Sequence, residues 1–271
     1  MPELPEVETV VRHLRPRLIG RNIQRFEASW PKVTAPAALA TVGAQLAGRR
    51  IVEVARRGKF ILLELDKGLV HIHLRMTGRL LLTPTGVPLG PHDRARFSLS
   101  GDDDLVFRDM RKFGRIGYLQ DRSILEAQLG PEPLDEAFTG DLLATLLKGH
   151  KRQIKPLLLD QSFIAGLGNI YVDEALFAAR IHPRALSHRV SRAKAHALHS
   201  AIREILAGSI AAQGTTFINF TWGADETGGY RMALRVFGRQ GQPCPVCETA
   251  LVKQWIGQRG THFCPRCQRK G

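Results

Sequence analysis

The stretch Phe60-Ile61-Leu62-Leu63-Glu64-Leu65-Asp66-Lys67-Gly68-Leu69-Val70-His71-Ile72-His73-Leu74 decides the fold of the first half of the chain. It holds two short β-rich runs, separated by the turn-prone tripeptide at positions 66–68. Similar runs surround it at residues 51–54, 79–82, 95–99, 105–108 and 115–119. Many short strands with close turns predict an antiparallel β-sandwich.

Helical sequence flanks this sandwich on both sides. Apolar residues from Leu4 to Leu18 recur at helical spacing before Gly20, and Pro16 is expected to limit or kink that helix. After a Gly- and Pro-rich linker at 129–133, helical patterns dominate, at residues 140–147, 154–159, 172–179, 191–210 and 215–220. The predicted class is α+β: an N-terminal β-sandwich domain with flanking helices (1–130), a helical domain (131–233) and a small C-terminal hairpin module (234–271).

The charge balance selects a class of partner. The 271 residues carry a formal net charge of +14, which indicates a polyanion such as nucleic acid. An anionic membrane is the weaker alternative, and a ribosome-associated protein would have a similar charge. No apolar run is long enough to span a membrane, and the acidic start is unlike a signal peptide. We therefore expect a soluble, cytoplasmic protein with no membrane partner.

All four cysteines lie near the C-terminus, as Cys244, Cys247, Cys264 and Cys267. Two Cys-x2-Cys pairs separated by sixteen residues fit the template of a zinc site, in which each pair presents two thiolates from one turn. Two disulfides are the alternative, but they need an oxidising compartment that nothing else in the sequence indicates. The prediction is one structural Zn²⁺, with any catalysis elsewhere because four thiolates fill the coordination shell.

Pro2 follows the initiator Met1 directly. Removal of Met1 would expose a secondary amine, which can attack an electrophilic carbon and form an iminium ion. The α-amino group titrates near neutrality, and Glu3 and Glu6 lie within reach as acid and base. The alternative is that Pro2 only opens a helix whose dipole the glutamates complement.

Motifs along the whole chain carry a close resemblance to a known family. They are Pro2-Glu3-Leu4-Pro5-Glu6-Val7-Glu8-Thr9, Arg57-Gly58-Lys59, His73-Leu74-Arg75-Met76, Arg111-Lys112-Phe113-Gly114, Gly166-Leu167-Gly168-Asn169-Ile170-Tyr171 and, in the four-cysteine finger, Gln258-Arg259. In this order they resemble bacterial formamidopyrimidine-DNA glycosylases. That resemblance implies a bifunctional base-excision repair enzyme, acting as a monomer on double-stranded DNA that contains oxidised purines (8-oxoguanine, formamidopyrimidines) or abasic sites.

The resemblance also implies a catalytic set at the N-terminus. The Pro2 amine attacks C1′ of the damaged nucleotide and displaces the base, and the resulting Schiff base permits β- and then δ-elimination of the phosphates. Glu3 is the acid that assists opening of the sugar, and Glu6 helps to organise the site. Lys59 contacts the phosphate beside the lesion, although an ordinary surface lysine is its alternative reading.

For DNA binding, the resemblance assigns roles by position. An enzyme that extrudes a base must fill the vacated space. Met76, Arg111 and Phe113 match the inserting trio, with plain core packing as the alternative for Met76 and Phe113. The other matching positions are His73 and His92 near the DNA backbone, Lys155 near the lesion, Asn169 in the phosphate-gripping turn of a helix–two-turn–helix motif, and Arg259 on the finger. A buried, hydrogen-bonded histidine is the alternative for His73.

Two positions depart from the family pattern, and two other functions stay open. Met110 stands where many relatives have proline, which would alter the rigidity of its loop, and Thr77 stands where some carry a glutamate. The loop 213–230 matches the family's cap over the flipped base. The alternatives are the sister activity on oxidised pyrimidines, of the endonuclease VIII type, which Leu4 disfavours, and a DNA-binding module without catalysis.

Overall fold

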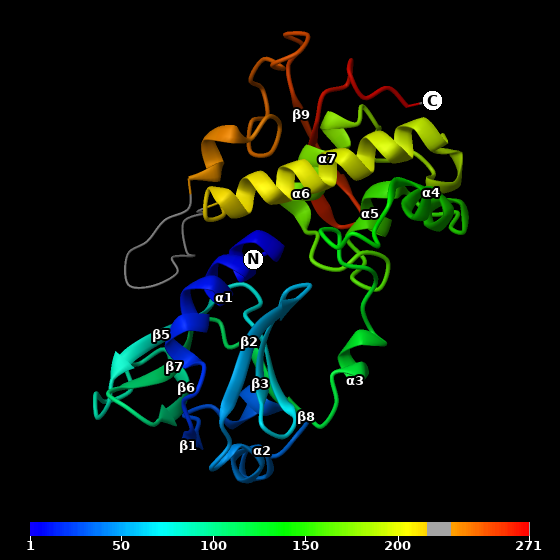
Figure 1. Ribbon diagram of the computed structural model, residues 1–271. Coiled ribbons are helices and arrows are strands. Elements are labelled where there is room, and N and C mark those ends of the chain that lie inside the picture. Colours follow the sequence, from blue (N-terminus) through cyan, green and yellow to red (C-terminus); the bar gives the residue numbers. More distant parts are fainter. Residues whose placement is uncertain (216–228, 271) are drawn as a thin grey trace. The chain divides into compact units, whose positions relative to one another are not determined.

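A computed structural model describes residues 1–215 and 229–270 (Figure 1). It divides into two compact units, one formed by Met1–Ala127 with Gln213–Gly229 and the other by Gln128–Ala212 with Tyr230–Gly271. The three-part division at residues 130 and 233 stays a prediction, and its last two parts share the second unit apart from the segment 213–229. Among the described residues, no helix is long and apolar enough to cross a membrane.

The first unit contains two four-stranded antiparallel sheets, which confirms the predicted sandwich. One sheet has the order β1 (Ile23–Glu27), β6 (Asp93–Leu99), β7 (Asp103–Asp109), β5 (Gly78–Pro84), and the other the order β2 (Ile51–Arg57), β3 (Phe60–Leu65), β4 (Leu69–His73), β8 (Arg115–Leu119). Sequence patterning missed β1. An irregular register between Ile23 and Arg25 breaks the alternation, so the buried residues Ile23 and Phe26 are three positions apart.

Helix α1 (Leu4–Leu18) completes the core of this unit. Its apolar residues Val7, Val11, Leu14 and Leu18 are buried in the same cluster as side chains of both sheets. The helix continues two residues past Pro16, so this proline does not end it at once. The short elements η1 (Pro31–Thr34), α2 (Leu39–Leu46) and α3 (Ser123–Glu126), which sequence patterning did not predict, complete the unit.

The second unit is helical and ends in a β-hairpin (Figure 1). Its elements are α4 (Gly140–Lys148), α5 (Ile154–Leu158), α6 (Asn169–Ala178), η2 (Ser187–Arg189), α7 (Arg192–Ala211), η3 (Tyr230–Ala233), β9 (Val252–Ile256) and β10 (Arg259–Phe263). The long α7 packs against both α4 and α6, and α6 also contacts β10. The helix predicted at 215–220 lies outside the described residues except for Thr215.

Candidate functional site

The N-terminal segment is held inside the first unit. Pro2 is buried, and Glu3, at the N-cap of α1, is only 3% exposed. Glu3 and Glu6 form a reciprocal capping box, in which Glu6 Oε2 accepts the backbone N–H of Glu3 at 2.9 Å. The residues predicted as nucleophile and acid are thus fixed by a helix start, and the helix-opener reading of Pro2 is compatible with the nucleophile reading.

Glu6 has a second partner far along the chain. Its Oε1 accepts hydrogen bonds from both the backbone N–H and the hydroxyl of Thr215, and Glu6 itself is 4% exposed. One carboxylate therefore ties the start of α1 to the start of the segment 215–229. This contact suits the organising role expected for Glu6.

Lys59 lies in the two-residue turn between β2 and β3, where Arg57 pairs with Phe60. Gly58 supplies the positive φ of 54° at the first turn position, which glycine adopts without strain. Lys59 is only 5% exposed, which excludes the reading as an ordinary surface lysine. Its positive charge contributes to lowering the pKa of His73, which pairs with Phe60 across β3 and β4.

His73 is a buried, neutral histidine at the end of β4. Burial, together with the charges of Arg75 and Lys59, lowers its pKa to about 3. Its Nδ1 accepts the backbone N–H of Arg75 at 3.0 Å, so the neutral ring carries its proton on Nε2. This bond braces a turn in which Arg75 has a φ of 55°, directly before Met76.

Met76, Arg111 and Phe113 come together on the surface of the first unit. Met76 is 42% exposed and Phe113 is 45% exposed, so neither is a core residue. Arg111 Nη1 lies 3.2 Å from Met76 Sδ, and its guanidinium stacks over the Phe113 ring at 4.6 Å from the centroid. These three side chains, which we call the wedge, form one exposed cluster drawn from two loops.

His92 is exposed, and its Nδ1 lies 3.3 Å from Arg94 Nη2. Arg94 is 9% exposed and donates from Nε to the backbone carbonyl of Asp109. The imidazole therefore lies at the surface of the same sheet whose β7 leads into the loop of Arg111 and Phe113.

In the second unit, a braced turn precedes α6. Gly166 has a φ of 86°, and its N–H is bound by Gln161 Oε1 at 3.0 Å. Gln161 Nε2 also donates to the carbonyl of Leu167, so this side chain, which sequence reasoning missed, holds the turn from both sides. Asn169 begins α6 and is half-buried, and its Nδ2 donates to the carbonyl of Gly260 at 2.9 Å.

Lys155 is placed differently from a surface phosphate ligand. It is fully buried, and its Nζ lies 2.6 Å from the equally buried Asp173 and 3.3 Å from the carbonyl of Gly260. The other oxygen of Asp173 accepts the backbone N–H of His262 at 2.8 Å. The DNA contact implied by resemblance stays a prediction, while the structure shows Lys155 joining α5 and α6 to β10.

The neighbouring residue Glu174 makes a second attachment. Its carboxylate accepts three backbone N–H groups, from Arg235, Val236 and Phe237, at 2.8–2.9 Å. Burial raises the pKa of Glu174, against the lowering effect of these three bonds. Consecutive carboxylates of α6 thus hold two different segments of the C-terminal region.

Arg259 is exposed at the first position of β10. The turn before it consists of Gly257 and Gln258, with φ values of 54° and 62°, and Arg259 pairs with Ile256 across the hairpin. Two positive φ values in a two-residue loop are the signature of a tight hairpin turn that follows the strand twist. The sequence placed Arg259 in the turn itself, whereas the structure places it at the exposed first position of the strand that follows, and its contact with DNA stays a prediction.

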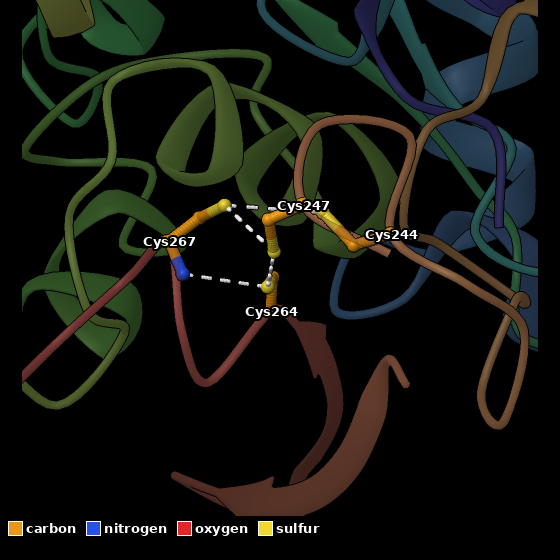
Figure 2. Close-up of side chains that lie close together, drawn as sticks. All are labelled: Cys244, Cys247, Cys264 and Cys267. Carbon is orange, nitrogen blue, oxygen red and sulfur yellow. Dashed lines mark hydrogen bonds between the residues drawn. The ribbon is translucent and has the colours of Figure 1, made fainter. Parts of the chain in front are cut away.

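The four cysteines converge with their thiols pointing toward one another (Figure 2). Their sulfur atoms all lie within 4.8 Å of one another, and those of Cys247 and Cys267 are 3.4 Å apart. A disulfide would need about 2.05 Å, whereas sulfurs in a tetrahedral site with Zn–S bonds of about 2.3 Å lie roughly 3.8 Å apart. The donor set fits one structural zinc and not the disulfide alternative.

Electrostatics within this cluster also call for a cation. Hydrogen bonds to Thr249 lower the pKa of Cys247 to about 6, while burial and the neighbouring thiols raise that of Cys267 to about 12. Four adjacent thiols cannot all ionise in the same place without a compensating charge. Zn²⁺ supplies that charge and would be held by all four sulfurs.

Comparisons with known proteins agree with this arrangement. Residues 1–116 match the formamidopyrimidine-DNA glycosylase N-terminal domain, residues 129–221 its H2TH domain, and residues 241–269 the zinc finger found in that family and in isoleucyl-tRNA synthetases. Together these matches define a DNA glycosylase class built from a β-sandwich, a helical domain and a zinc finger. The chain belongs to the formamidopyrimidine-DNA glycosylase family.

Full-length relatives support the assignment. The formamidopyrimidine-DNA glycosylase of Chloroflexus aggregans is 45% identical, with 99% of this chain and 98% of that one covered, and that of Carboxydothermus hydrogenoformans is 40% identical over 99% and 100%. Among solved structures, a Lactococcus lactis mutant bound to Fapy-dG DNA is 36% identical, with a TM-score of 0.92 over 99% of this chain and 100% of that one. A complex with carbocyclic 8-oxo-G DNA is 37% identical, with a TM-score of 0.91 and the same coverage.

Proposed function

We propose that this protein is a bifunctional DNA glycosylase and abasic-site lyase that excises oxidised purines from double-stranded DNA. Relatives solved with Fapy-dG or 8-oxo-G DNA support the substrate class. The observation that carries the proposal is the buried Pro2–Glu3 segment, held at the start of α1 by Glu6. Phosphate binding alone would not require a helix start fixed in this way.

The chemistry requires a free secondary amine at Pro2, and therefore removal of Met1, because an acylated nitrogen is not nucleophilic. The amine attacks C1′, the C1′–N9 bond breaks, and the base leaves with its bonding electrons and a proton. Opening of the sugar gives an iminium ion that draws electrons from C2′. Loss of the C2′ proton then expels the 3′ phosphate, and a second elimination expels the 5′ phosphate.

Three side chains would assist these steps. Glu3 donates its proton toward O4′ as the sugar ring opens, and Lys59 offers its ammonium to the phosphate beside the lesion. Glu6 already accepts hydrogen bonds through both oxygens, from Glu3 and from Thr215. We therefore assign it a positioning role at the start of α1.

DNA would be held by groups in both units. The wedge enters the space left by the flipped base, and the apolar surface of Met76 and Phe113 replaces lost stacking while Arg111 meets the estranged base. In the second unit, Asn169 with the amides at the start of α6, and Arg259 on the hairpin, would grip phosphates. We propose that the protein works as a monomer, in a reducing, cytoplasmic compartment where the four thiols persist.

Borohydride trapping tests the covalent step. The wild-type protein should be trapped on a duplex containing 8-oxoguanine, and Pro2→Gly should weaken trapping severely. Glu3→Gln should slow base release. The matched change Glu8→Gln, further along the same helix and in ion pairs with Arg12 and Arg56, should not. Full trapping by a chain with a blocked N-terminus would sink the Pro2 mechanism.

A panel of duplexes tests the lesion class. It would contain 8-oxoguanine, formamidopyrimidine, thymine glycol or a bare abasic site, each opposite varied bases. We expect excision of the two oxidised purines and cleavage of the abasic site. Preference for thymine glycol would favour the pyrimidine-directed sister activity, and binding without excision would favour a non-catalytic DNA-binding module.

A further inference from the structure

The carboxylate of Asp109 lies beneath the wedge and is completely buried. Asp109 is the last residue of β7 and pairs with Gly78 at the start of β5. It therefore stands where the loop carrying Met76 ends and the loop carrying Phe113 begins. Sequence reasoning assigned it no role.

Both oxygens of this carboxylate accept hydrogen bonds from the two loops. Oδ1 accepts the Thr77 hydroxyl and the backbone N–H of Arg111 at 3.1 Å, and Oδ2 accepts the N–H groups of Phe113 and Gly114, each at 2.8 Å. A carboxylate offers about four acceptor positions, and four donors fill them. All four of these bonds fix the conformation of the two loops.

Thr77 joins the two loops. It directly follows Met76 and is 7% exposed. Its hydroxyl donates to Asp109 and accepts the backbone N–H of Arg111 at 3.2 Å. The methionine of one loop and the arginine of the other are thus connected through a single buried hydroxyl.

The backbone of the second loop needs this support. Lys112, between Arg111 and Phe113, has a φ of 58°, a conformation that L-residues other than asparagine and aspartate rarely adopt. A Cβ on Gly114 would lie 2.3 Å from the Phe107 ring, so that position accepts only glycine without a shift. Met110, where the family resemblance leads us to expect proline, is exposed and adds no such restraint.

We propose that Asp109, acting with Thr77, is a positioning residue that holds the wedge in its inserting arrangement before DNA binds. Ordering a flexible loop on binding would cost conformational entropy for each immobilised residue. A wedge that is already assembled avoids that cost when the base is displaced. This inference rests on the proposed base-flipping function and specifies which buried groups make the wedge effective.

The test compares substitutions on one strand. Asp109→Asn keeps the side-chain shape but turns an NH2 donor toward N–H donors. Its matched control is Asp104→Asn, also buried and also on β7, where the carboxylate accepts the N–H of Leu99 and lies near Arg96. Thr77→Val removes the bridging hydroxyl without changing the size of the side chain, and Thr77→Ser restores it.

Two readouts separate wedge positioning from Schiff-base chemistry. For Asp109→Asn and Thr77→Val, we expect kcat/KM on an 8-oxoguanine duplex to fall about tenfold, equivalent to about 1.4 kcal/mol. For the same two variants, the rise in 2-aminopurine fluorescence that accompanies DNA binding, with the probe placed opposite a tetrahydrofuran site, should also be lost. Borohydride trapping on a single-stranded abasic oligonucleotide, which has no opposite base to displace, should stay within about twofold. Asp104→Asn and Thr77→Ser should behave as wild type in all three measurements.

Several outcomes would overturn the inference. Equal losses for Asp104→Asn and Asp109→Asn would show a general effect on the sheet. An equal fall in single-stranded trapping would show that Asp109 acts on the covalent step. Should Asp109→Asn fail to fold, an unchanged fluorescence rise with Thr77→Val would be decisive against the inference. Absence of trapping by the wild-type protein itself would instead contradict the proposed function.

Discussion

Glu6 and Thr215 are joined by two hydrogen bonds, each 2.9 Å long, from the backbone N–H and the hydroxyl of Thr215 to one carboxylate oxygen. The second oxygen of Glu6 accepts the N–H of Glu3. The start of α1 and the start of the segment 215–229 therefore share one anchor. A substitution of either Glu6 or Thr215 should therefore alter the position of the proposed nucleophile, Pro2.

We expect Glu6→Gln to reduce activity strongly, although it changes only one side-chain oxygen to an NH2 group. Glutamine has one acceptor oxygen, so its NH2 group must face a donor from either Glu3 or Thr215. A buried unsatisfied donor costs about 1–3 kcal/mol. Excision and abasic-site cleavage should fall together. Thr215→Val, which keeps the backbone bond, should have a milder effect in the same assays, and a neutral Glu6→Gln would contradict the anchoring role.

His73 should make stability depend on pH. Its folded pKa of about 3 lies below the ordinary value of 6.5, so the unfolded chain binds the extra proton between these values. The contribution of neutral His73 to the free energy of unfolding is therefore fully present above about pH 6.5. As the pH falls below that value, the free energy of unfolding declines by about 1.4 kcal/mol per pH unit for this single group. His73→Asn keeps an acceptor for the Arg75 N–H but does not titrate there. Urea unfolding measured at several pH values below 6.5 should show that the free energy of unfolding of His73→Asn falls less steeply with decreasing pH than that of the wild type.

The buried pair Lys155–Asp173 leads to a stability prediction. Lys155→Met removes the lysine countercharge from a buried carboxylate, and breaking a buried ion pair in this way typically costs about 3–5 kcal/mol. The melting temperature should fall. The double substitution Lys155→Met with Asp173→Asn should recover part of the lost stability. The exposed Lys151→Met serves as control. A stable Lys155→Met protein that lost only lesion excision would instead support the direct contact implied by resemblance.

Arg259 and the zinc site should govern DNA affinity. Arg259→Ala should weaken duplex binding and reduce the slope of log affinity against log salt by about one. The matched control is Arg266→Ala, an exposed arginine between Cys264 and Cys267. Zinc chelation should weaken binding in the same direction, while trapping at saturating DNA persists. Loss of Schiff-base trapping with intact affinity would refute a purely structural finger.

The sequence predicted local patterns better than buried polar partners. The strands Phe60–Leu65 and Arg115–Leu119 were predicted to the residue, because these β-rich runs are bounded by turn-prone residues. The cluster of four thiols followed from the spacing of the cysteines. Asp109 and Asp173 were missed because each is bound by a side chain from a distant segment, Thr77 and Lys155 respectively, and no periodicity records such pairings.

The adjacent attachments made by Asp173 and Glu174 bear on how this chain could be cut or recombined. Successive residues of a helix point about 100° apart, so α6 grips His262 on one side and the backbone at 235–237 on another. A finger excised at residue 234 would deprive Glu174 of its three backbone donors and Asp173 of the N–H of His262, leaving Asp173 with Lys155 alone. The zinc-bearing segment is therefore not a portable cassette, and chimeras should exchange it together with α6.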